Sequence, residues 1–269
     1  MPRLHAPNGL AALAPLWREG RTGFELARLL RDPRFRHADR RAGRGRPVLL
    51  VPGFLAGDDS LAVMTKWLRR NGYHTRKAGL RANVGCSGEL VERLEDRLEE
   101  LVERQGTRAA IVGQSRGGTL ARVVARRRPD LVSGIVTLGT PHVEPFAIHP
   151  LVGFQLIAVG ALGTLRVPGL FSRSCLYGDC CAEFWEQSEA RLPKGVGFVS
   201  VYSRSDGVVD WRACLASGAE HVEIRSSHIG MAVNATAFRA IGDALASFRW
   251  RERSRRARDA SVTPLRRAA

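Results

Sequence analysis

Short apolar runs alternate with helical segments along most of this chain, and that alternation restricts the folds it can adopt. Helical periodicity is most regular at 88–105, where Leu and Val hold one face and Glu and Arg the other. Strands separated by helices predict an α/β fold, with a mostly parallel sheet and helices on both faces. The strand candidates are 47–51, 73–80, 109–112, 134–138, 198–202 and 221–224. Further helices are predicted at 58–70, after the turn at 113–118 to about 127, and at 235–248 behind Asn234 as N-cap.

The same pattern divides the chain into regions. We expect a basic N-terminal helical extension at 1–46, one α/β domain at 47–250, and a basic, disordered tail at 251–269. Within the domain, residues 142–194 interrupt the alternation and predict a cap or lid over the edge of the sheet. Their almost wholly apolar stretch at 151–165 is shorter than the ~20 residues of a membrane-spanning helix, so a buried or interfacial helix is expected.

The formal net charge of +16 is concentrated at the two ends of the chain. Residues 1–46 carry eleven Arg against four acids and residues 251–269 seven against two, which gives +7 and +5 and leaves +4 elsewhere. We expect these ends to be solvated surface, and peripheral contact with an anionic membrane is the open alternative. Without a nucleic-acid motif or an aromatic-interleaved basic stretch, nucleic acid is not an expected partner. Prolines interrupt the first apolar residues, unlike a secretory signal, so a cytoplasmic protein is expected.

The five cysteines are expected to be free thiols in that compartment. Cys175, Cys180 and Cys181 lie close together in the sequence and can pair under oxidising conditions. A zinc site built from these three and a histidine would match no common ligand spacing. We therefore expect neither a metal ion nor an organic cofactor.

The turn at 113–118, Gly-Gln-Ser-Arg-Gly-Gly, is the strongest candidate for chemistry. It follows a strand and precedes a helix, which is the setting of a Gly-x-Ser-x-Gly nucleophile turn, although a plain turn is the alternative. Gly113 and Gly117 allow the close backbone approach that such a turn needs around Ser115, the candidate nucleophile. The backbone N–H of Arg116 is the first expected oxyanion donor, and that of Phe54, after strand 47–51, is the second.

An acid and a base are expected after later strands, in that order. Asp206 and Asp210 share the loop after 198–202, and Asp206 is preferred because Gly207 permits a sharp turn beside it; Asp210 is the alternative acid. His228, among small neighbours after the last strand, is the candidate base. Asp206 would hold the tautomer of His228, which would take the Ser115 proton and deliver it to the leaving alcohol.

With these residues in view, the chain resembles bacterial α/β-hydrolases of the esterase and triacylglycerol lipase kind over about 47–250. The segments that carry the resemblance, in the family's order, are Pro52-Gly53-Phe54, 113–118, Leu138-Gly139-Thr140-Pro141-His142, Ser205-Asp206-Gly207-Val208-Val209 and Ser227-His228-Ile229-Gly230. The resemblance implies the α/β-hydrolase fold, ester hydrolysis and the triad Ser115, Asp206 and His228.

Two residues beside the nucleophile depart from that family's pattern. Gln114 stands where the family more often has His, and we expect it to serve as a polar support. Arg116 stands where the family more often has an uncharged residue. We expect an outward-facing surface side chain, and the alternative is a side chain that projects toward the acyl pocket and favours an anionic substrate.

The sequence thus predicts a serine-dependent carboxylic-ester hydrolase that uses an acyl-enzyme intermediate on an apolar or lipid-like ester. An acyltransferase or thioesterase on the same fold is one alternative. The other is a non-catalytic protein of this fold that binds an anionic membrane or nucleic acid through its basic ends. The oligomeric state is left open.

Overall fold

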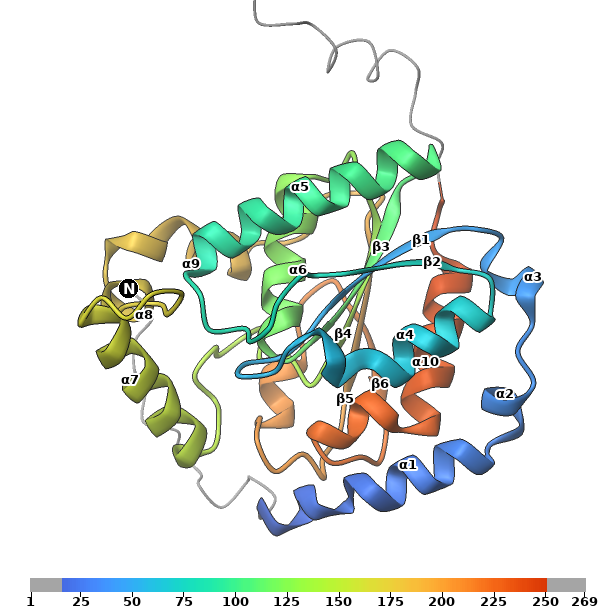
Figure 1. The fold of residues 1–269 in the computed structure, drawn as a ribbon, viewed down its shortest axis with the longest axis horizontal. Helices are drawn as coiled ribbons and strands as arrows, with labels where there is room; N and C mark the ends of the chain where they lie inside the picture. The colour runs from blue at the N-terminus through green and yellow to red at the C-terminus, as the bar shows by residue number, and fades with distance from the viewer. Residues whose placement is uncertain (1–15, 251–269) are drawn as a thin grey trace, which may run out of the picture.

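The computed structural model describes residues 16–250, so the predicted tail at 251–269 and the first fifteen residues lie outside it (Figure 1). Its centre is a six-stranded sheet of order β2-β1-β3-β4-β5-β6 in which every pairing is parallel. The strands are β1 (Pro47–Val51), β2 (His74–Lys77), β3 (Ala109–Gln114), β4 (Val132–Leu138), β5 (Gly197–Tyr202) and β6 (Glu220–Glu223). The predicted α/β fold with a mostly parallel sheet is confirmed.

Two hydrophobic clusters cover the two faces of this sheet, because alternate strand residues point to opposite sides. Leu49 and Val51 of β1 belong to the cluster formed with α5 (Ser87–Gln105) and α6 (Arg116–Arg127). Val48 and Leu50 belong to the other cluster. The helices packed there are α1 (Thr22–Arg31), α4 (Ala62–Arg70) and α10 (Ala235–Ser247).

Local signals explain where several elements begin and end. The side chain of Asn234 accepts hydrogen bonds from the backbone of Thr236 and Ala237, so α10 has the predicted N-cap. Gly79 has a φ of +78°, and β2 therefore ends before the predicted residue 80. The predicted helix 58–70 begins as a 3-10 turn, η3 (Asp58–Leu61), and continues as α4.

The described part of the N-terminal segment is helical and packs back onto the domain. It contains η2 (Leu16–Arg21), α1, α2 (Pro33–Arg36) and α3 (Arg40–Gly43). Helix α1 contacts α10 and the short helix η6 (Ile229–Val233), which follows His228 (Figure 1). This segment therefore lies against the loop that carries the candidate base.

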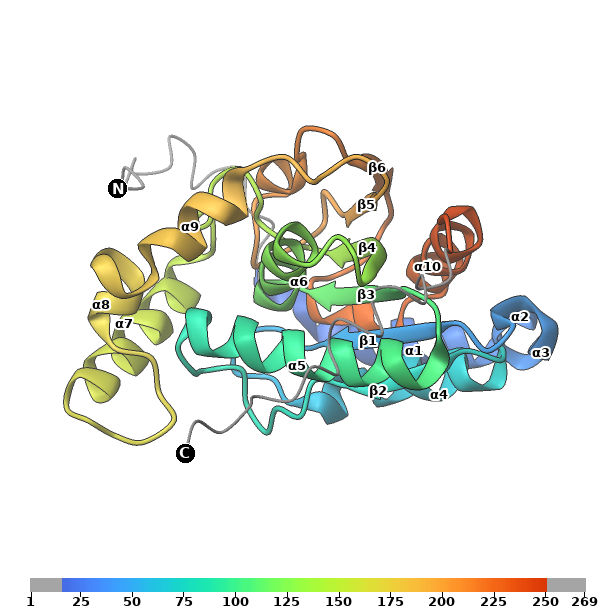
Figure 2. The ribbon, with the colours of Figure 1, turned by 90° about the horizontal axis from the view of Figure 1, so that it is seen from above.

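The insertion between β4 and β5 carries α7 (Pro150–Thr164), α8 (Arg173–Tyr177), η4 (Asp179–Cys181) and α9 (Ala182–Glu189). Figure 2 shows α7, α8 and α9 grouped at the end of the molecule toward which the strands point. Only Gly160 of α7 is buried, whereas Phe154 is 68% exposed. Of the two states expected for this stretch, a buried or an interfacial helix, the structure therefore excludes the buried one. Within residues 16–250, no helix combines the length and the apolar character needed to cross a membrane.

Candidate active site

Ser115 lies on a strained turn between β3 and α6, with φ 51° and ψ −125°. Glycine neighbours make this turn sterically feasible. A Cβ on Gly117 would overlap the Val51 carbonyl oxygen, and a Cβ on Gly113 would lie 2.5 Å from the Gly117 carbonyl oxygen. A non-glycine residue at positive φ costs free energy, and such strain is a feature of catalytic serine turns.

Asp206 and His228 form a buried pair after β5 and β6. Asp206 Oδ2 lies 2.7 Å from His228 Nδ1, and Asp206 Oδ1 accepts the backbone N–H groups of Val208 and Val209 at 2.8 Å each. Both carboxylate oxygens are therefore engaged, which holds the imidazole orientation. Burial disfavours the imidazolium, but the charge and hydrogen bond of Asp206, with a contribution from Glu19, outweigh it and raise the pKa of His228.

Asp210, the alternative acid, is engaged elsewhere. Its Oδ1 accepts the backbone N–H of Arg212 at 3.0 Å and lies 3.5 Å from the Arg212 guanidinium. The carboxylate thereby caps the short helix η5 (Trp211–Cys214). The structure brings Asp206, and not Asp210, to His228.

Gln114, the residue before Ser115 at the end of β3, connects the nucleophile turn to His228 by a hydrogen bond. The Gln114 amide donates to the His228 carbonyl oxygen at 3.0 Å, which agrees with the supporting role expected of Gln114. Gly139, after β4, has a φ of +54°, and a Cβ there would lie 2.9 Å from His228 Nδ1. Among the hydrogen bonds of residues 16–250 there is none between Ser115 Oγ and His228. Such contacts often tighten only when substrate binds.

Two acidic residues of the N-terminal segment hold the base loop, and the sequence analysis missed both. Glu19 accepts the backbone N–H groups of Gly207, His228 and Ile229 at 2.9–3.0 Å. Glu25 is buried and accepts from the Ser226 hydroxyl at 2.7 Å and from the Ser227 backbone at 2.9 Å. The one available signal was that these are two of only four acids among eleven arginines in 1–46.

The expected oxyanion donors border the nucleophile. Arg116 is the first residue of α6, where a backbone N–H has no acceptor within its own helix. A Cβ on Gly53 would lie 3.3 Å from Ser115 Cβ, so the turn that carries Phe54 packs directly against the nucleophile. Phe54, Ser115 and Arg116 line one pocket.

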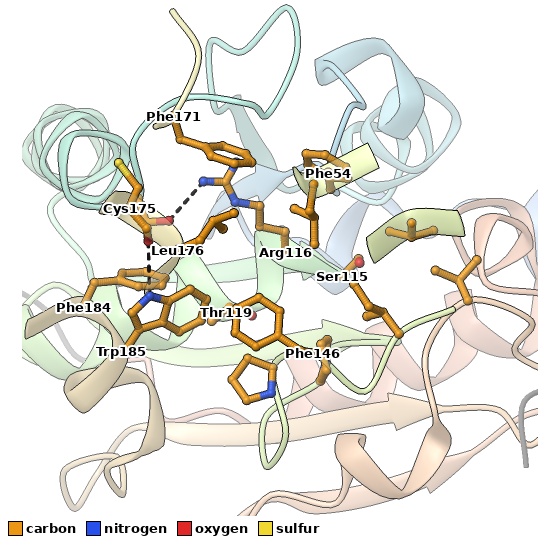
Figure 3. Close-up of a pocket in the computed structure, with 17 residues that line it drawn as sticks. Phe54, Ser115, Arg116, Thr119, Phe146, Phe171, Cys175, Leu176, Phe184 and Trp185 are labelled. Atoms are coloured by element: carbon orange, nitrogen blue, oxygen red, sulfur yellow. Dashed lines mark hydrogen bonds between the residues drawn. The ribbon is translucent and has the colours of Figure 1, made fainter. Parts of the chain in front are cut away.

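That pocket is mostly apolar and extends from Ser115 into the inserted helices. Figure 3 shows Ser115 and Phe54 near one end of the pocket and Phe184 and Trp185 at the other. Further lining side chains include Phe146, Ile148, Val152, Leu156, Phe171 and Leu176. An apolar pocket of this kind suits an acyl chain.

The expectation that Arg116 faces outward was wrong. Its guanidinium donates to the carbonyl oxygens of Asn83 and Gly85, to Asn83 Oδ1 and to Ser87 Oγ, at 2.7–3.1 Å. The residue as a whole keeps some exposure, but desolvation of the guanidinium lowers the pKa of Arg116 to about 10. These partners come from the loop before α5 and from its first residue, about thirty residues upstream, so no local pattern revealed them.

The parallel sheet, the serine turn and the Asp–His pair at the strand ends define an α/β-hydrolase fold. No family model matches the chain. It is 33% identical over 141 residues to a triacylglycerol lipase from Burkholderia plantarii and 34% identical over 115 residues to one from Pseudarthrobacter phenanthrenivorans. The matches cover 49% and 39% of this chain but only 38% and 36% of those lipases.

Solved structures show the same fold. A lipase from Bacillus licheniformis in its mature form superposes with a TM-score of 0.57 at 16% identity, over 80% of this chain and 96% of its own. A monoacylglycerol lipase from Paleococcus ferrophilus has a TM-score of 0.52 at 16% identity, over 76% and 95%. The predicted resemblance to bacterial esterases and lipases is confirmed.

Proposed function

We propose that this chain is a serine-dependent carboxylic-ester hydrolase that acts on an apolar or lipid-like ester through an acyl-enzyme intermediate. The observation that carries the proposal is the 2.7 Å contact between the buried Asp206 and His228, at the sheet edge where the strained Ser115 turn lies. An acid, a base and a nucleophile in this order are what acyl transfer requires.

The reaction would proceed in two halves. Ser115 Oγ attacks the ester carbonyl carbon while His228 takes the serine proton, and Asp206 stabilises the imidazolium that forms. The N–H groups of Arg116 and Phe54 donate to the oxyanion. The bond to the alcohol then breaks as His228 returns the proton to it. Water, activated by His228, cleaves the acyl-enzyme and releases the acid.

The apolar pocket supports an acyl group of low polarity as the part of the substrate bound beside Ser115. Residues 142–194 act in this proposal as a cap, because Phe146, Leu156 and Trp185 supply part of the pocket wall. The engagement of Arg116 with the loop before α5 argues against its use as a site for an anionic substrate. The names of the similar proteins, lipases for tri- and monoacylglycerols, support a lipid ester.

Labelling and turnover together test this proposal. Wild-type protein is incubated with a fluorophosphonate probe and with p-nitrophenyl esters of increasing acyl length. Ser115→Ala should abolish labelling and lower kcat by up to about 10⁶-fold. Ser60→Ala is the matched control, since the exposed Ser60 hydroxyl donates to the carbonyl oxygen of Gly57, just before η3, and does not line the pocket. Equal labelling and turnover of wild type and Ser115→Ala would contradict the proposal.

Acyl transfer shares the first half-reaction, so product analysis separates it from hydrolysis. With added alcohols, a hydrolase yields mainly the free acid, whereas an acyltransferase yields mainly the new ester. Thioester substrates in the same panel test the thioesterase alternative.

A further inference from the structure

Four of the five cysteines meet at one point between the core and the inserted helices. Cys86 precedes α5, Cys175 lies in α8, and Cys180 and Cys181 lie in η4. All four sulfur atoms lie within 4.8 Å of one another. The sequence analysis singled out three of them but missed Cys86, which lies 94 residues from Cys180.

The spacing of these sulfur atoms fits a tetrahedral metal site. The Cys175–Cys180, Cys86–Cys181 and Cys86–Cys180 sulfur distances are 3.4, 3.6 and 3.7 Å. A zinc–sulfur bond of about 2.3 Å in a regular tetrahedron separates the sulfur atoms by about 3.8 Å. The observed separations are close to that edge length and far from the ~2.05 Å of a disulfide.

The positive charge of Arg116, beside the four cysteines, also favours a negatively charged metal–thiolate centre at this place. The desolvated guanidinium of Arg116 has only neutral acceptors, and no carboxylate within residues 16–250 lies at ion-pair distance from it. The thiols of Cys181, Cys86 and Cys175 are the groups whose negative charge would stabilise this cation. Figure 3 shows the Arg116 side chain directed toward Phe171 and Cys175, away from Ser115.

A bound divalent cation deprotonates the thiols that coordinate it, so the four cysteines would bind zinc as thiolates. Four thiolates around Zn²⁺ carry a net charge of −2, which supplies the counter-charge that Arg116 lacks.

We propose that Cys86, Cys175, Cys180 and Cys181 bind one zinc ion in a structural site that joins the inserted helices to the α/β core. On binding, the thiols release their protons to solvent and each sulfur donates an electron pair to the metal. Four sulfur ligands complete the tetrahedron and leave no position for water, so the ion takes no part in ester hydrolysis. Cys175 also lines the pocket beside Ser115, so the site would hold one wall of that pocket in place.

Metal analysis is the direct test, and it does not depend on the proposed hydrolase activity. The full chain is produced in zinc-supplemented medium, purified under reducing conditions without chelator, and analysed by inductively coupled plasma mass spectrometry. We expect one zinc per chain in wild type and loss of zinc in Cys86→Ser and Cys180→Ser. Cys214→Ser is the matched control, because Cys214 is a buried cysteine outside the cluster and should leave the zinc content unchanged. Cys180 is exposed, so its substitution removes a ligand without emptying the core, and circular dichroism verifies the fold.

Two further measurements separate zinc from the competing states. Cobalt-substituted protein should show the intense thiolate-to-metal charge-transfer bands of tetrahedral sulfur coordination. Protein unfolded with chelator but without reductant should present all five thiols to Ellman's reagent. Folded wild type that lacks zinc, stoichiometric iron in its place, or a thiol count lowered by disulfides would each overturn the proposal.

Discussion

Glu19 accepts the backbone N–H of His228 at 2.9 Å, although 209 residues separate the two in the chain. The same carboxylate accepts the N–H groups of Gly207, beside the candidate acid, and of Ile229. One side chain of the N-terminal segment thus connects the acid loop to the base loop. Its charge also contributes to the raised pKa of His228, so Glu19 is a positioning residue with an electrostatic effect.

Glu19→Gln should therefore shift the pH dependence of ester hydrolysis. His228 accepts a proton only when neutral, so its raised pKa sets the acid limb of kcat/KM. Removal of the negative charge lowers that pKa and moves the acid limb to lower pH. The weakened hydrogen bonds should also reduce plateau kcat/KM about tenfold. Glu220→Gln, at an exposed position in β6, removes the same charge and should leave the limb in place. An acid limb that stays fixed or moves upward in Glu19→Gln would contradict this role.

Asp206→Asn and Asp210→Asn distinguish the two acids on one loop. Asn at 206 can keep the contacts with Val208 and Val209 but does not hold the imidazole in the required tautomer, so kcat should fall about 10⁴-fold. Asp210→Asn alters only the cap of η5 and the Arg212 pair, and kcat should change less than about threefold. Steady-state kinetics with one soluble ester checks both, and the reverse order of effects would refute the assignment of the acid.

The sequence predicted those parts of the fold and site whose signals are local. Hydrophobic periodicity predicted β1 and α5, and the strand ends predicted where Ser115, Asp206 and His228 lie, because parallel strands bring their carboxyl ends to one edge. The contacts of Glu19 with His228 and of Cys86 with Cys180 join segments 209 and 94 residues apart. No periodicity or motif connects such segments, so only the folded chain revealed them. The burial of Arg116 escaped prediction for the same reason.

Gly139→Ala tests how closely β4 approaches the Asp206–His228 pair. The backbone at Gly139 has a φ of +54°, and a Cβ would lie 2.9 Å from His228 Nδ1 and 3.0 Å from Asp206 Oδ2. The substitution should lower the free energy of unfolding by about 1–2 kcal/mol through backbone strain. Displacement of the imidazole should lower kcat about 100-fold. Both quantities are accessible by urea unfolding and steady-state kinetics.

Gly195→Ala separates backbone strain from contact with the site. Gly195 also has a positive φ, +90°, but a Cβ there would meet nothing within 4 Å. It should therefore lose comparable stability and retain its kcat. If both variants lose kcat alike, strain and not displacement of His228 accounts for the effect of Gly139→Ala.

The exposed face of α7 predicts contact with a lipid surface. Phe154 is 68% exposed and Leu151 is 51% exposed, on a helix without a charged side chain. Val152 and Leu156 of the same helix line the pocket beside Ser115. Transfer of a phenylalanine side chain from water to an apolar phase is favourable by about 1.5–3 kcal/mol. Phe154→Ser should therefore weaken binding to phosphatidylcholine vesicles at least tenfold, measured by cosedimentation.

Turnover of a short, monomeric ester should be nearly unchanged in Phe154→Ser, because the side chain points to solvent and does not line the pocket. Zwitterionic vesicles remove the attraction between the basic ends and anionic lipid, so the measurement isolates the apolar face. Leu30→Ser, at a 53% exposed leucine on α1, is the control for loss of apolar surface elsewhere. Equal vesicle binding by Phe154→Ser and wild type, or an equal loss in both variants, would show that α7 does not direct the chain to lipid.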